Sequence, residues 1–299
     1  MADVVVVGTG LIGTSCALAL RASGFTGRIA GIGRSRANLD AARARGAIDR
    51  GYAFEERWAS ELVGARTVLV AVPIAQNRSV FAALAPALDA ASVIIDAGST
   101  KQEVIAAARA TLGAHLARFV PSHPVAGSER SGAEAANAGL YVGRQVIVTP
   151  LPETDPEALR AAGEFWTACG ARIASLDAAR HDRIFAAVSH LPHLLAFLLV
   201  DEIASRADSA EYLANAGGGF RDFTRIAASS PEMWRDIALA NRDALQSEIA
   251  VFRQALDALA LSISHGDGTA IEALLERAAK VRRTWGESGV GATEGVPAI

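Results

Sequence analysis

The glycine-rich segment near the N-terminus constrains the fold of this chain more than any other feature. Gly8, Gly10 and Gly13 form a G-x-G-x-x-G pattern directly after four consecutive valines at 4–7. Between a strand and a helix, the first glycine of this pattern permits the tight turn, the second lets a pyrophosphate approach the backbone, and the third lets helix and strand pack closely. The pyrophosphate then lies at the positive N-terminus of the helix. The pattern predicts a dinucleotide site with contacts from Gly8, Gly10, Leu11, Ile12 and Gly13.

The first half of the chain alternates short apolar runs with alanine-rich segments. Near-continuous apolar strands are typical of a parallel sheet covered by helices on both faces. The expected strands lie at 4–7, 28–32, 67–72, 93–96, 119–121, 145–149 and 172–176. We therefore expect an α/β fold, with a Rossmann-type doubly wound parallel sheet over residues 1–176.

The second half contains no convincing strand after Asp177. Its pattern predicts an all-α C-terminal domain over 177–285, with helices at 178–204, 212–215, 233–262 and 268–285, and a flexible tail over 286–299. The apolar stretches at 194–200 and 237–261 exceed what so small a domain can cover alone. They predict a homodimer formed through the helical domain.

Charge and cysteine content exclude several classes of function. Lys plus Arg number 29 against 32 for Asp plus Glu, which leaves no basic field for nucleic acid or an anionic membrane. The only cysteines, Cys16 and Cys169, cannot form a disulfide framework or a zinc cluster. The N-terminus enters the first strand without a signal sequence, and the apolar run at 184–200 is interrupted by polar residues, which favours a buried helix over a membrane span. We expect a cytoplasmic protein with a small-molecule partner.

The end of the second strand bears on the choice of dinucleotide. Gly33 stands where a carboxylate would accept the ribose 2′-hydroxyl of NAD, and two arginines and a serine follow it. Guanidinium groups and a hydroxyl suit a 2′-phosphate, so NADP is favoured over NAD; solvated arginines in a loop are the alternative. The cofactor contacts expected here and after the third strand are Arg34, Ser35, Arg36, Val72 and Pro73.

Polar segments follow two of the expected strands, at 96–101 and at 122–129. Ligands of open α/β sheets bind outside the carboxyl ends of the strands, so both segments face the nicotinamide side of the site. A single histidine at a strand end is often structural. Because two polar strand ends converge here, we interpret His123 as a functional residue.

The first long helix of the second half carries a polar face. Asp182, Ser189 and His193 are spaced by seven and four residues, which places Ser189 about 20° behind Asp182 and His193 about 20° ahead of it on an α-helix. Pro192 should kink this helix and free a carbonyl. Polar groups on so apolar a helix need partners or a ligand, and a solvent-facing stripe is the alternative.

A third polar segment, at 217–226, combines glycines with Arg221, Asp222 and Arg225. A planar guanidinium binds a carboxylate through paired donors, so this segment predicts recognition of an acidic substrate. We expect Asp222 to hold one arginine while the other faces the substrate.

Together, the segments at 96–101, 122–129, 181–193 and 218–228, with Trp234 and Asn241, resemble the motif series of the prephenate/arogenate (cyclohexadienyl) dehydrogenase family in order and spacing. The resemblance extends from the glycine loop to about residue 285. It implies NAD(P)-dependent oxidative decarboxylation of prephenate to 4-hydroxyphenylpyruvate, or of arogenate to tyrosine, without a metal.

The resemblance also implies roles for individual residues. His123 takes the proton of the substrate 4-hydroxyl while hydride leaves for the nicotinamide; Ser99 shares that hydroxyl, and His193 is a second catalytic histidine. Arg225 binds the substrate carboxylate, Glu129 gates substrate entry, and Lys101 lies near cofactor and substrate. The residues expected to bind substrate are Arg225, Arg221, Glu129, Asp182, Ser189 and Gly219.

Departures from the family pattern leave some questions open. Many relatives carry an acid where this chain has Gly33, so the family does not decide between NAD and NADP. We expect neither a regulatory ACT domain nor a chorismate mutase beside these 299 residues, and we expect any inhibition by tyrosine to act at the active site. One alternative is another two-domain Rossmann oxidoreductase, of the β-hydroxyacid dehydrogenase or imine reductase type. The former needs an interdomain lysine, and none occurs between Lys101 and Lys280. The other alternative is a non-catalytic NAD(P)-sensing protein.

Overall fold

A six-stranded parallel sheet forms the centre of the N-terminal domain in the structure, a computed structural model that describes residues 3–287. The strand order is β3-β2-β1-β4-β5-β6, which is the order of a dinucleotide-binding Rossmann sheet. The strands are β1 (Val4–Val7), β2 (Ile29–Gly33), β3 (Arg50–Ala53), β4 (Thr67–Val70), β5 (Val93–Asp96) and β6 (Phe119–Val120). The expected fold class is therefore confirmed. Only β3 lacks the apolar run by which the other strands were predicted.

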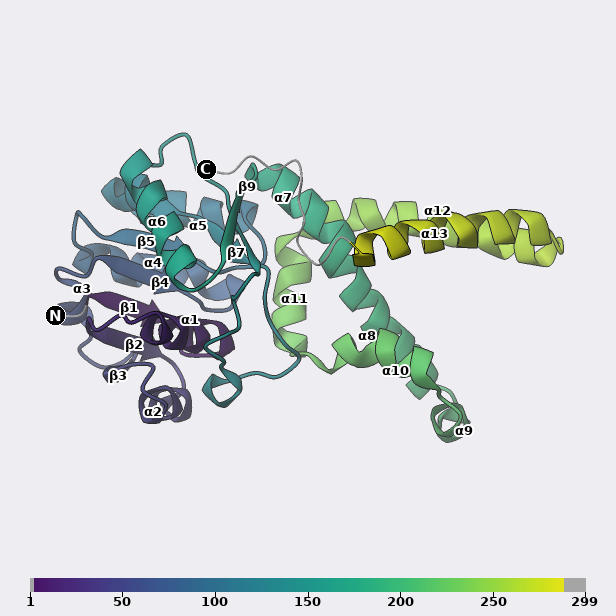
Figure 1. The fold of residues 1–299 in the computed structure, drawn as a ribbon, viewed down its shortest axis with the longest axis horizontal. Coiled ribbons are helices and arrows are strands. Elements are labelled where there is room, and N and C mark those ends of the chain that lie inside the picture. Colours follow the sequence, from purple (N-terminus) through teal and green to yellow (C-terminus); the bar gives the residue numbers. More distant parts are fainter. Residues whose placement is uncertain (1–2, 288–299) are drawn as a thin grey trace.

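Helices cover both faces of this sheet (Figure 1). The valines of β1 alternate between the two faces: Val4 and Val6 belong to the apolar cluster that also contains Trp166, whereas Val5 and Val7 belong to the cluster around Phe81. Strand pleating produces this alternation, and it makes β1 buried along its whole length. The helices of this domain are α1 (Leu11–Ala22), α2 (Arg36–Ala44), α3 (Ala59–Leu62), α4 (Asn77–Leu84), α5 (Gln102–Thr111) and α6 (Pro156–Ala168).

A second, three-stranded sheet follows, which the sequence pattern did not predict. The expected strand at 119–121 ends at Pro121, because proline has no backbone N–H for the ladder. The chain then changes sheets: β7 (Ser122–Pro124) pairs antiparallel with β8 (Gln145–Val148), and β8 pairs parallel with β9 (Arg172–Ser175). This change places His123 within a strand rather than after one.

The rest of the described chain is helical, as expected. In Figure 1, α12 and α13 form a hairpin that extends away from the sheets, and α8 and α10 form a second arm. The elements are α7 (Ala178–Phe185), a π-helical turn (Ala186–His190), α8 (Leu191–Ala204), α9 (Ser209–Ala214), α10 (Gly218–Thr224), α11 (Pro231–Ala240), α12 (Arg242–Ser264) and α13 (Gly268–Glu287). The single helix expected at 233–262 is wrong, because the backbone leaves the helical region at Asn241. Of the expected tail, Gly286 and Glu287 belong to α13, and 288–299 lie outside the described residues.

The combined helix Ala178–Ala204 has a mean hydropathy of 1.7 and is long and apolar enough to cross a membrane by length and composition. Only 28% of its apolar window is buried, so the expected buried helix is buried on one side only. That side includes His181, Asp182 and His190, which meet the sheet domain.

Candidate active site

The glycine loop between β1 and α1 is built to accept a pyrophosphate. Gly8 adopts φ 100°, and a Cβ on it would lie 2.3 Å from the Ala71 carbonyl oxygen; a Cβ on Gly13 would lie 2.1 Å from the Gly8 carbonyl oxygen. A Cβ on Gly10, by contrast, would meet nothing within 4 Å. Gly10 begins α1 without a side-chain cap, and the first turn carries no acid. The free N–H groups of this turn therefore fit an anionic ligand beside Gly10.

The end of β2 gives the two expected arginines different surroundings. Arg36 forms an ion pair with Glu56, and Ser35 caps α2 by accepting a hydrogen bond from Asn38 N at 3.2 Å. Arg34 is exposed and donates to the side-chain oxygen of Gln76 at 2.8 Å. Arg34 is therefore better placed than Arg36 to receive an additional anion.

Val72 and Pro73 follow β4 on the same side as the glycine loop. A Cβ on Gly8 would lie 3.1 Å from Val72 N, so the two loops are in contact. Val72 therefore lies beside the glycine loop, and the contacts of Val72 and Pro73 with the cofactor stay predictions.

A chain of three side chains extends from β7 into the helical domain. His123 Nδ1 lies 2.8 Å from His181 Nε2, and His181 Nδ1 lies 2.8 Å from Asp182 Oδ1. His181 and Asp182 are fully buried, and His123 is 7% exposed. Phe185 stacks on His181 and packs edge-on against His123. The phenyl ring of Phe185 holds both imidazoles in place and excludes water from these three hydrogen-bonded side chains.

The hydrogen bonds among these three side chains determine which ring nitrogens of His123 and His181 carry a proton. Asp182 also accepts from Lys101 N at 2.8 Å and Gln102 N at 2.9 Å, so its carboxylate is surrounded by donors. His181 Nδ1 must then carry a proton, which makes Nε2 of the neutral ring an acceptor. His123 Nδ1 donates to that acceptor, and the remaining lone pair of neutral His123 is on Nε2. This is the tautomer that a general base needs.

Electrostatics keep both rings neutral near pH 7. Burial, followed by the charges of His181, Lys101 and His190, lowers the pKa of His123 well below 6.5. Burial likewise lowers the pKa of His181. Burial alone would raise the pKa of Asp182, but the hydrogen bonds from His181 and the two backbone amides outweigh it and lower the pKa. The carboxylate therefore stays ionised beside neutral imidazoles.

Asp182 thus does not share a substrate-facing side with Ser189 and His193, and the prediction of one polar face is wrong. The prediction assumed α-helical spacing throughout, whereas the π-helical turn between Asp182 and His193 changes the rotation between them. This turn directly precedes Pro192, where a regular helix would lose a hydrogen bond. Pro192 therefore does disturb the helix as expected, but as a π turn that redirects its faces.

His193 lies further along the same helix, partly buried. Its Nδ1 donates to the Ser189 carbonyl oxygen at 2.8 Å, which leaves Nε2 as the acceptor of the neutral ring. The imidazole stacks on Trp234, with ring centroids 3.8 Å apart and an interplanar angle of 21°. Burial, and secondarily the charge of Arg225, lowers the pKa of His193. Ser189 contributes its carbonyl here and holds His193 in place.

Arg225 joins the two domains through an ion pair with Glu129, in which Nη1 lies 3.3 Å from Oε2. Both side chains are partly exposed, so the pair can open to a competing carboxylate at low cost. Asp222 forms no ion pair with Arg221 or Arg225 in the part of the chain that the structure describes, which contradicts the expected pairing. Arg221 is exposed, and Gly219 lies in the first turn of α10 rather than in a glycine turn.

Lys101 occupies a different place from the one expected of a cofactor contact. Its side chain is fully buried, forms an ion pair with Asp96 and donates to the Ser122 carbonyl oxygen at 2.6 Å. Ser99, two residues before it, is partly exposed in the loop after β5. Ser99 is thus partly accessible after the carboxyl end of β5, whereas the Lys101 side chain is fully buried.

Sequence reasoning did not single out His181, His190 and Asn241 as site residues. Asn241 Nδ2 lies 2.8 Å from the Asp182 carbonyl oxygen and 3.0 Å from His190 Nδ1. An amide nitrogen only donates, so His190 carries its proton on Nε2. Burial lowers the pKa of His190 to about 4. For Asn241 the available signal was the residue type, since asparagine disfavours a helix interior.

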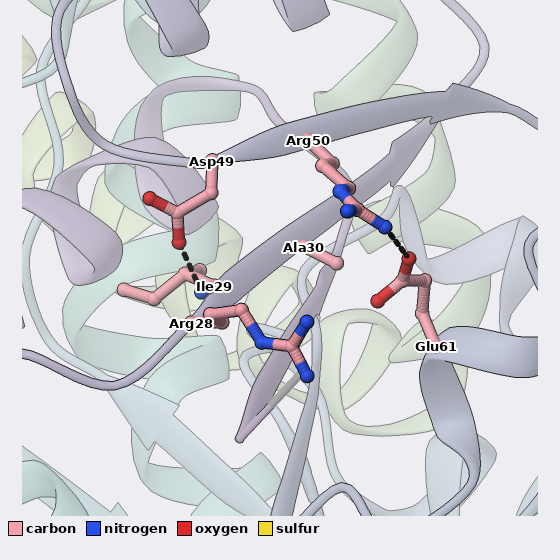
Figure 2. Close-up of a pocket in the computed structure, with 6 residues that line it drawn as sticks. All are labelled: Arg28, Ile29, Ala30, Asp49, Arg50 and Glu61. Carbon is pink, nitrogen blue, oxygen red and sulfur yellow. Dashed lines mark hydrogen bonds and ion pairs between the residues drawn. The ribbon is translucent and has the colours of Figure 1, made fainter. Parts of the chain in front are cut away.

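A small pocket lies at the opposite end of the sheet, where β2 and β3 begin (Figure 2). Arg50 reaches Glu61 there at 3.3 Å, and Asp49 accepts from Ile29 N at 2.7 Å. The Arg50, Glu61 and Asp49 side chains therefore have partners within the pocket lining. The pocket is also remote from the carboxyl ends of the strands, where ligands of such sheets bind. Among residues 3–287, no group of three or more His, Cys, Asp or Glu side chains is arranged to hold a metal ion.

Comparison with known proteins matches both halves of the chain to one family. Residues 16–175 match the model described as prephenate dehydrogenase, nucleotide-binding domain, and residues 177–277 match prephenate dehydrogenase, dimerization domain. The cyclohexadienyl dehydrogenase of Zymomonas mobilis is 34% identical over 267 residues, which is 89% of each chain. The prephenate dehydrogenase of Bacillus subtilis is 34% identical over 266 residues, 88% of this chain and 71% of that one.

Solved structures of prephenate and arogenate dehydrogenases are also similar to this chain. Prephenate dehydrogenase from Aquifex aeolicus in complex with hydroxyphenyl propionate and NAD+ superposes with a TM-score of 0.85 at 34% identity, covering 95% of this chain and 98% of that one. Synechocystis arogenate dehydrogenase superposes with a TM-score of 0.77 at 28% identity, covering 94% and 99%.

Proposed function

Because the chain belongs to the prephenate dehydrogenase family, whose members are oxidoreductases of tyrosine biosynthesis, we propose that it oxidises prephenate with NADP and that His123 is the base. The observation that carries the assignment of the base is the hydrogen-bonded chain of His123, His181 and Asp182, which leaves a lone pair on His123 Nε2. A sensing protein would have no use for a neutral imidazole fixed in this tautomer. The protein is thus a dehydrogenase, and we propose prephenate as its substrate and NADP as its cofactor.

The nicotinamide cofactor, when bound, supplies the hydride acceptor. The chain supplies the remaining functions. His123 Nε2 accepts the proton of the 4-hydroxyl, and Ser99 binds the same oxygen. The positive charge that develops on His123 is stabilised through His181 by the Asp182 carboxylate. Arg225 exchanges Glu129 for a substrate carboxylate, and His193 Nε2 is available to a further polar group of the substrate. The ring carboxylate then leaves as CO2, and its bonding electrons complete the aromatic ring, which drives this step.

We favour prephenate over arogenate because of where the carboxylates lie. An ammonium on the substrate would need an acidic partner. Asp182 was the candidate, but it is buried with three donors already around it. Asp182 is therefore not free to bind the ammonium that distinguishes arogenate. Glu129 pairs with Arg225 and becomes available only when Arg225 exchanges it for the substrate carboxylate.

We favour NADP because the end of β2 presents Arg34 and no acid. The pairing of Arg36 with Glu56 weakens the expected two-arginine clamp, and the preference then rests on Arg34 and Gly33. The variant Gly33→Asp tests this proposal. Its Cβ would lie 3.1 Å from Thr9 Oγ1, a side chain that can move aside. We expect the ratio of kcat/KM for NADP over NAD to fall at least about tenfold, since the new carboxylate repels the 2′-phosphate and accepts from a 2′-hydroxyl. An unchanged ratio would place cofactor selection elsewhere.

The deciding experiment is a steady-state assay of prephenate or arogenate with NAD or NADP, followed by the absorbance of the reduced nicotinamide. We expect the highest kcat/KM with prephenate and NADP. Turnover with arogenate alone would overturn the substrate proposal. No turnover in any combination, by folded protein that binds a dinucleotide, would overturn the proposed reaction.

We also propose that the enzyme is a homodimer of the cytoplasm, assembled through the helical domain. Support for the dimer comes from the family description of the second domain and from apolar side chains on the α12–α13 hairpin that are exposed in the single chain. These side chains are Ile249, Val251, Phe252, Leu256, Leu261, Ile263, Leu275 and Val281. A second copy packed against this hairpin would cover them.

A further inference from the structure

Lys101 and Asp96 form a fully buried ion pair that the proposed reaction does not use directly. A buried pair is costly to assemble, because both charges leave water, and apolar residues of similar size often give equal or greater stability. Stability alone therefore does not explain its presence. Its surroundings do, since the pair contacts the backbone of Ser122, next to His123, and of Gly98, next to Ser99.

The side chains of the pair hold the backbone of Ser122, the residue directly before His123. Asp96 Oδ1 accepts from Ser122 N at 2.9 Å, and the Lys101 ammonium donates to the Ser122 carbonyl oxygen at 2.6 Å. Asp96 Oδ2 also accepts from Gly98 N at 2.8 Å, next to Ser99. Both backbone groups of Ser122 are thus fixed at the point where the chain leaves one sheet and enters the other.

The backbone of Lys101 contacts Asp182, which ends the series of hydrogen-bonded side chains that begins at His123. Its N–H donates to Asp182 Oδ1, and Gln102 N donates to Asp182 Oδ2, so Asp182 acts as an N-terminal cap of α5 supplied by the helical domain. The same Oδ1 accepts from His181. A hydrogen-bonded ring is therefore closed through Lys101, Ser122, His123, His181 and Asp182, and it crosses the boundary between the domains twice.

We propose that Lys101 and Asp96 are positioning residues for the base, which set the place and tautomer of His123 through this ring, and that Lys101 is not a contact of the cofactor. The proposal rests on the proposed role of His123. It assigns the buried pair to the reaction through geometry alone, because neither side chain reaches the surface where a substrate would bind.

The double variant Asp96→Asn/Lys101→Met tests the proposal. It removes both charges together and nearly preserves volume, so that no unpaired charge remains buried. Glu61→Gln is the matched control, since Glu61 is a buried carboxylate at the far end of the same sheet. If the double variant fails to fold by circular dichroism, Asp96→Asn/Lys101→Gln is used, because it also leaves no unpaired charge buried.

We expect the Kd for NADP to stay within about twofold of the wild-type value and kcat to fall about 10- to 100-fold, the usual effect of a misplaced catalytic group. The acid limb of the kcat/KM profile should move to higher pH. His123 is faced by His181, Lys101 and His190, and by Asp182 through His181, and the Lys101 charge is one of those that lower its pKa. A kcat and pH profile equal to those of Glu61→Gln would overturn the proposal. So would a large rise in Kd with kcat retained at saturating cofactor.

A second readout does not depend on turnover. In protein labelled with 15N-histidine, the His123 signal, assigned with His123→Gln, should report a neutral ring protonated on Nδ1. In the double variant it should report mixed tautomers and a higher pKa. An unchanged signal would overturn the proposal even if the assays had failed to identify a substrate. A changed signal in the double variant, together with no turnover by the wild type, would support the positioning role of the pair and overturn the proposed reaction.

Discussion

At the scale of single residues, the active site depends on which nitrogen of each imidazole carries the proton. Backbone amides force Asp182 to act only as an acceptor, and this fixes His181 and then His123 in turn. His193 is fixed separately by the Ser189 carbonyl. Each histidine is therefore prepared for one role before a ligand arrives, so little free energy is lost to reorganisation in the reaction.

Replacement of His123 by asparagine should lower kcat about 10²- to 10⁴-fold with a modest effect on KM, because a general base is lost while the binding groups remain. The wild-type kcat/KM should be constant above pH 6.5 and fall only well below it, since the base works deprotonated and its pKa is lowered. The variant should lose this acid limb. The exposed His265→Asn serves as the control. Full turnover by His123→Asn would remove this residue from the mechanism.

Replacement of Arg225 by alanine should raise KM for the substrate at least about tenfold and change kcat less, because the guanidinium is assigned to binding. Arg221→Ala is the matched control, four residues earlier and exposed. Steady-state kinetics at saturating cofactor measure both. An unchanged KM for Arg225→Ala together with a raised KM for Arg221→Ala would exchange their roles.

At the scale of elements, turns and helix breaks position the chemistry. The Gly8–Gly13 loop directs the start of α1 toward the cofactor, Pro121 moves the chain from β6 to β7, and the π turn before Pro192 redirects the long helix. Asn241 then separates α11 from α12 and uses its side chain to join Asp182 and His190. Each break places a polar group where a continuous element would not.

The glycine loop provides a prediction at this scale. Gly13→Ala should destabilise the fold by about 1–3 kcal/mol, because its Cβ would lie 2.1 Å from a backbone oxygen that cannot move independently. Gly10→Ala should leave the melting temperature nearly unchanged, because its Cβ meets nothing within 4 Å, yet raise the Kd for the dinucleotide at least about tenfold. Thermal unfolding and a binding titration test the pair. Equal cofactor affinity in wild type and Gly10→Ala would place the pyrophosphate elsewhere.

The sequence predicted those parts of the fold that have a local signature. Apolar runs identified β1, β2, β4 and β5, and the glycine spacing identified the cofactor loop. Pro121 and Asn241 are local signals of a break, but the pairing of β7 with β8 and the contacts of the Asn241 side chain were not predicted, because they depend on partners distant in sequence. The same holds for His181: its contact with His123 spans 58 residues, and no periodicity encodes it. Asp182 was misplaced because ideal helical spacing was assumed across a π turn.

At the scale of the whole molecule, a rigid sheet domain carries two helical arms, and the catalytic groups lie where they join (Figure 1). The hydrogen-bonded ring and the Arg225–Glu129 pair both cross this junction. The arms beyond it expose apolar surface that a single chain cannot cover. The proposed dimer would therefore be linked to the site through α8 and α12, which contact each other.

The apolar hairpin provides a prediction at this scale. Leu256→Glu on α12 should convert a dimer into monomers, because a charge would be buried at the interface without a partner. Val63→Glu is the control, since Val63 is similarly exposed but lies in the sheet domain. Light scattering after size exclusion at micromolar concentration measures the mass. A wild-type protein with the mass of one chain would contradict the proposed dimer.

The burial of Asp182 has a consequence for the route by which protons leave the enzyme. His181 and Asp182 have no contact with water, and two backbone amides close the far side of the carboxylate. A proton taken up by His123 Nε2 therefore has no exit through the protein interior. It must depart from the face by which it arrived, after the product has left that face. Resetting the base is then coupled in time to product release, and a solvent deuterium effect on turnover would include this late step in addition to the proton transfer to His123.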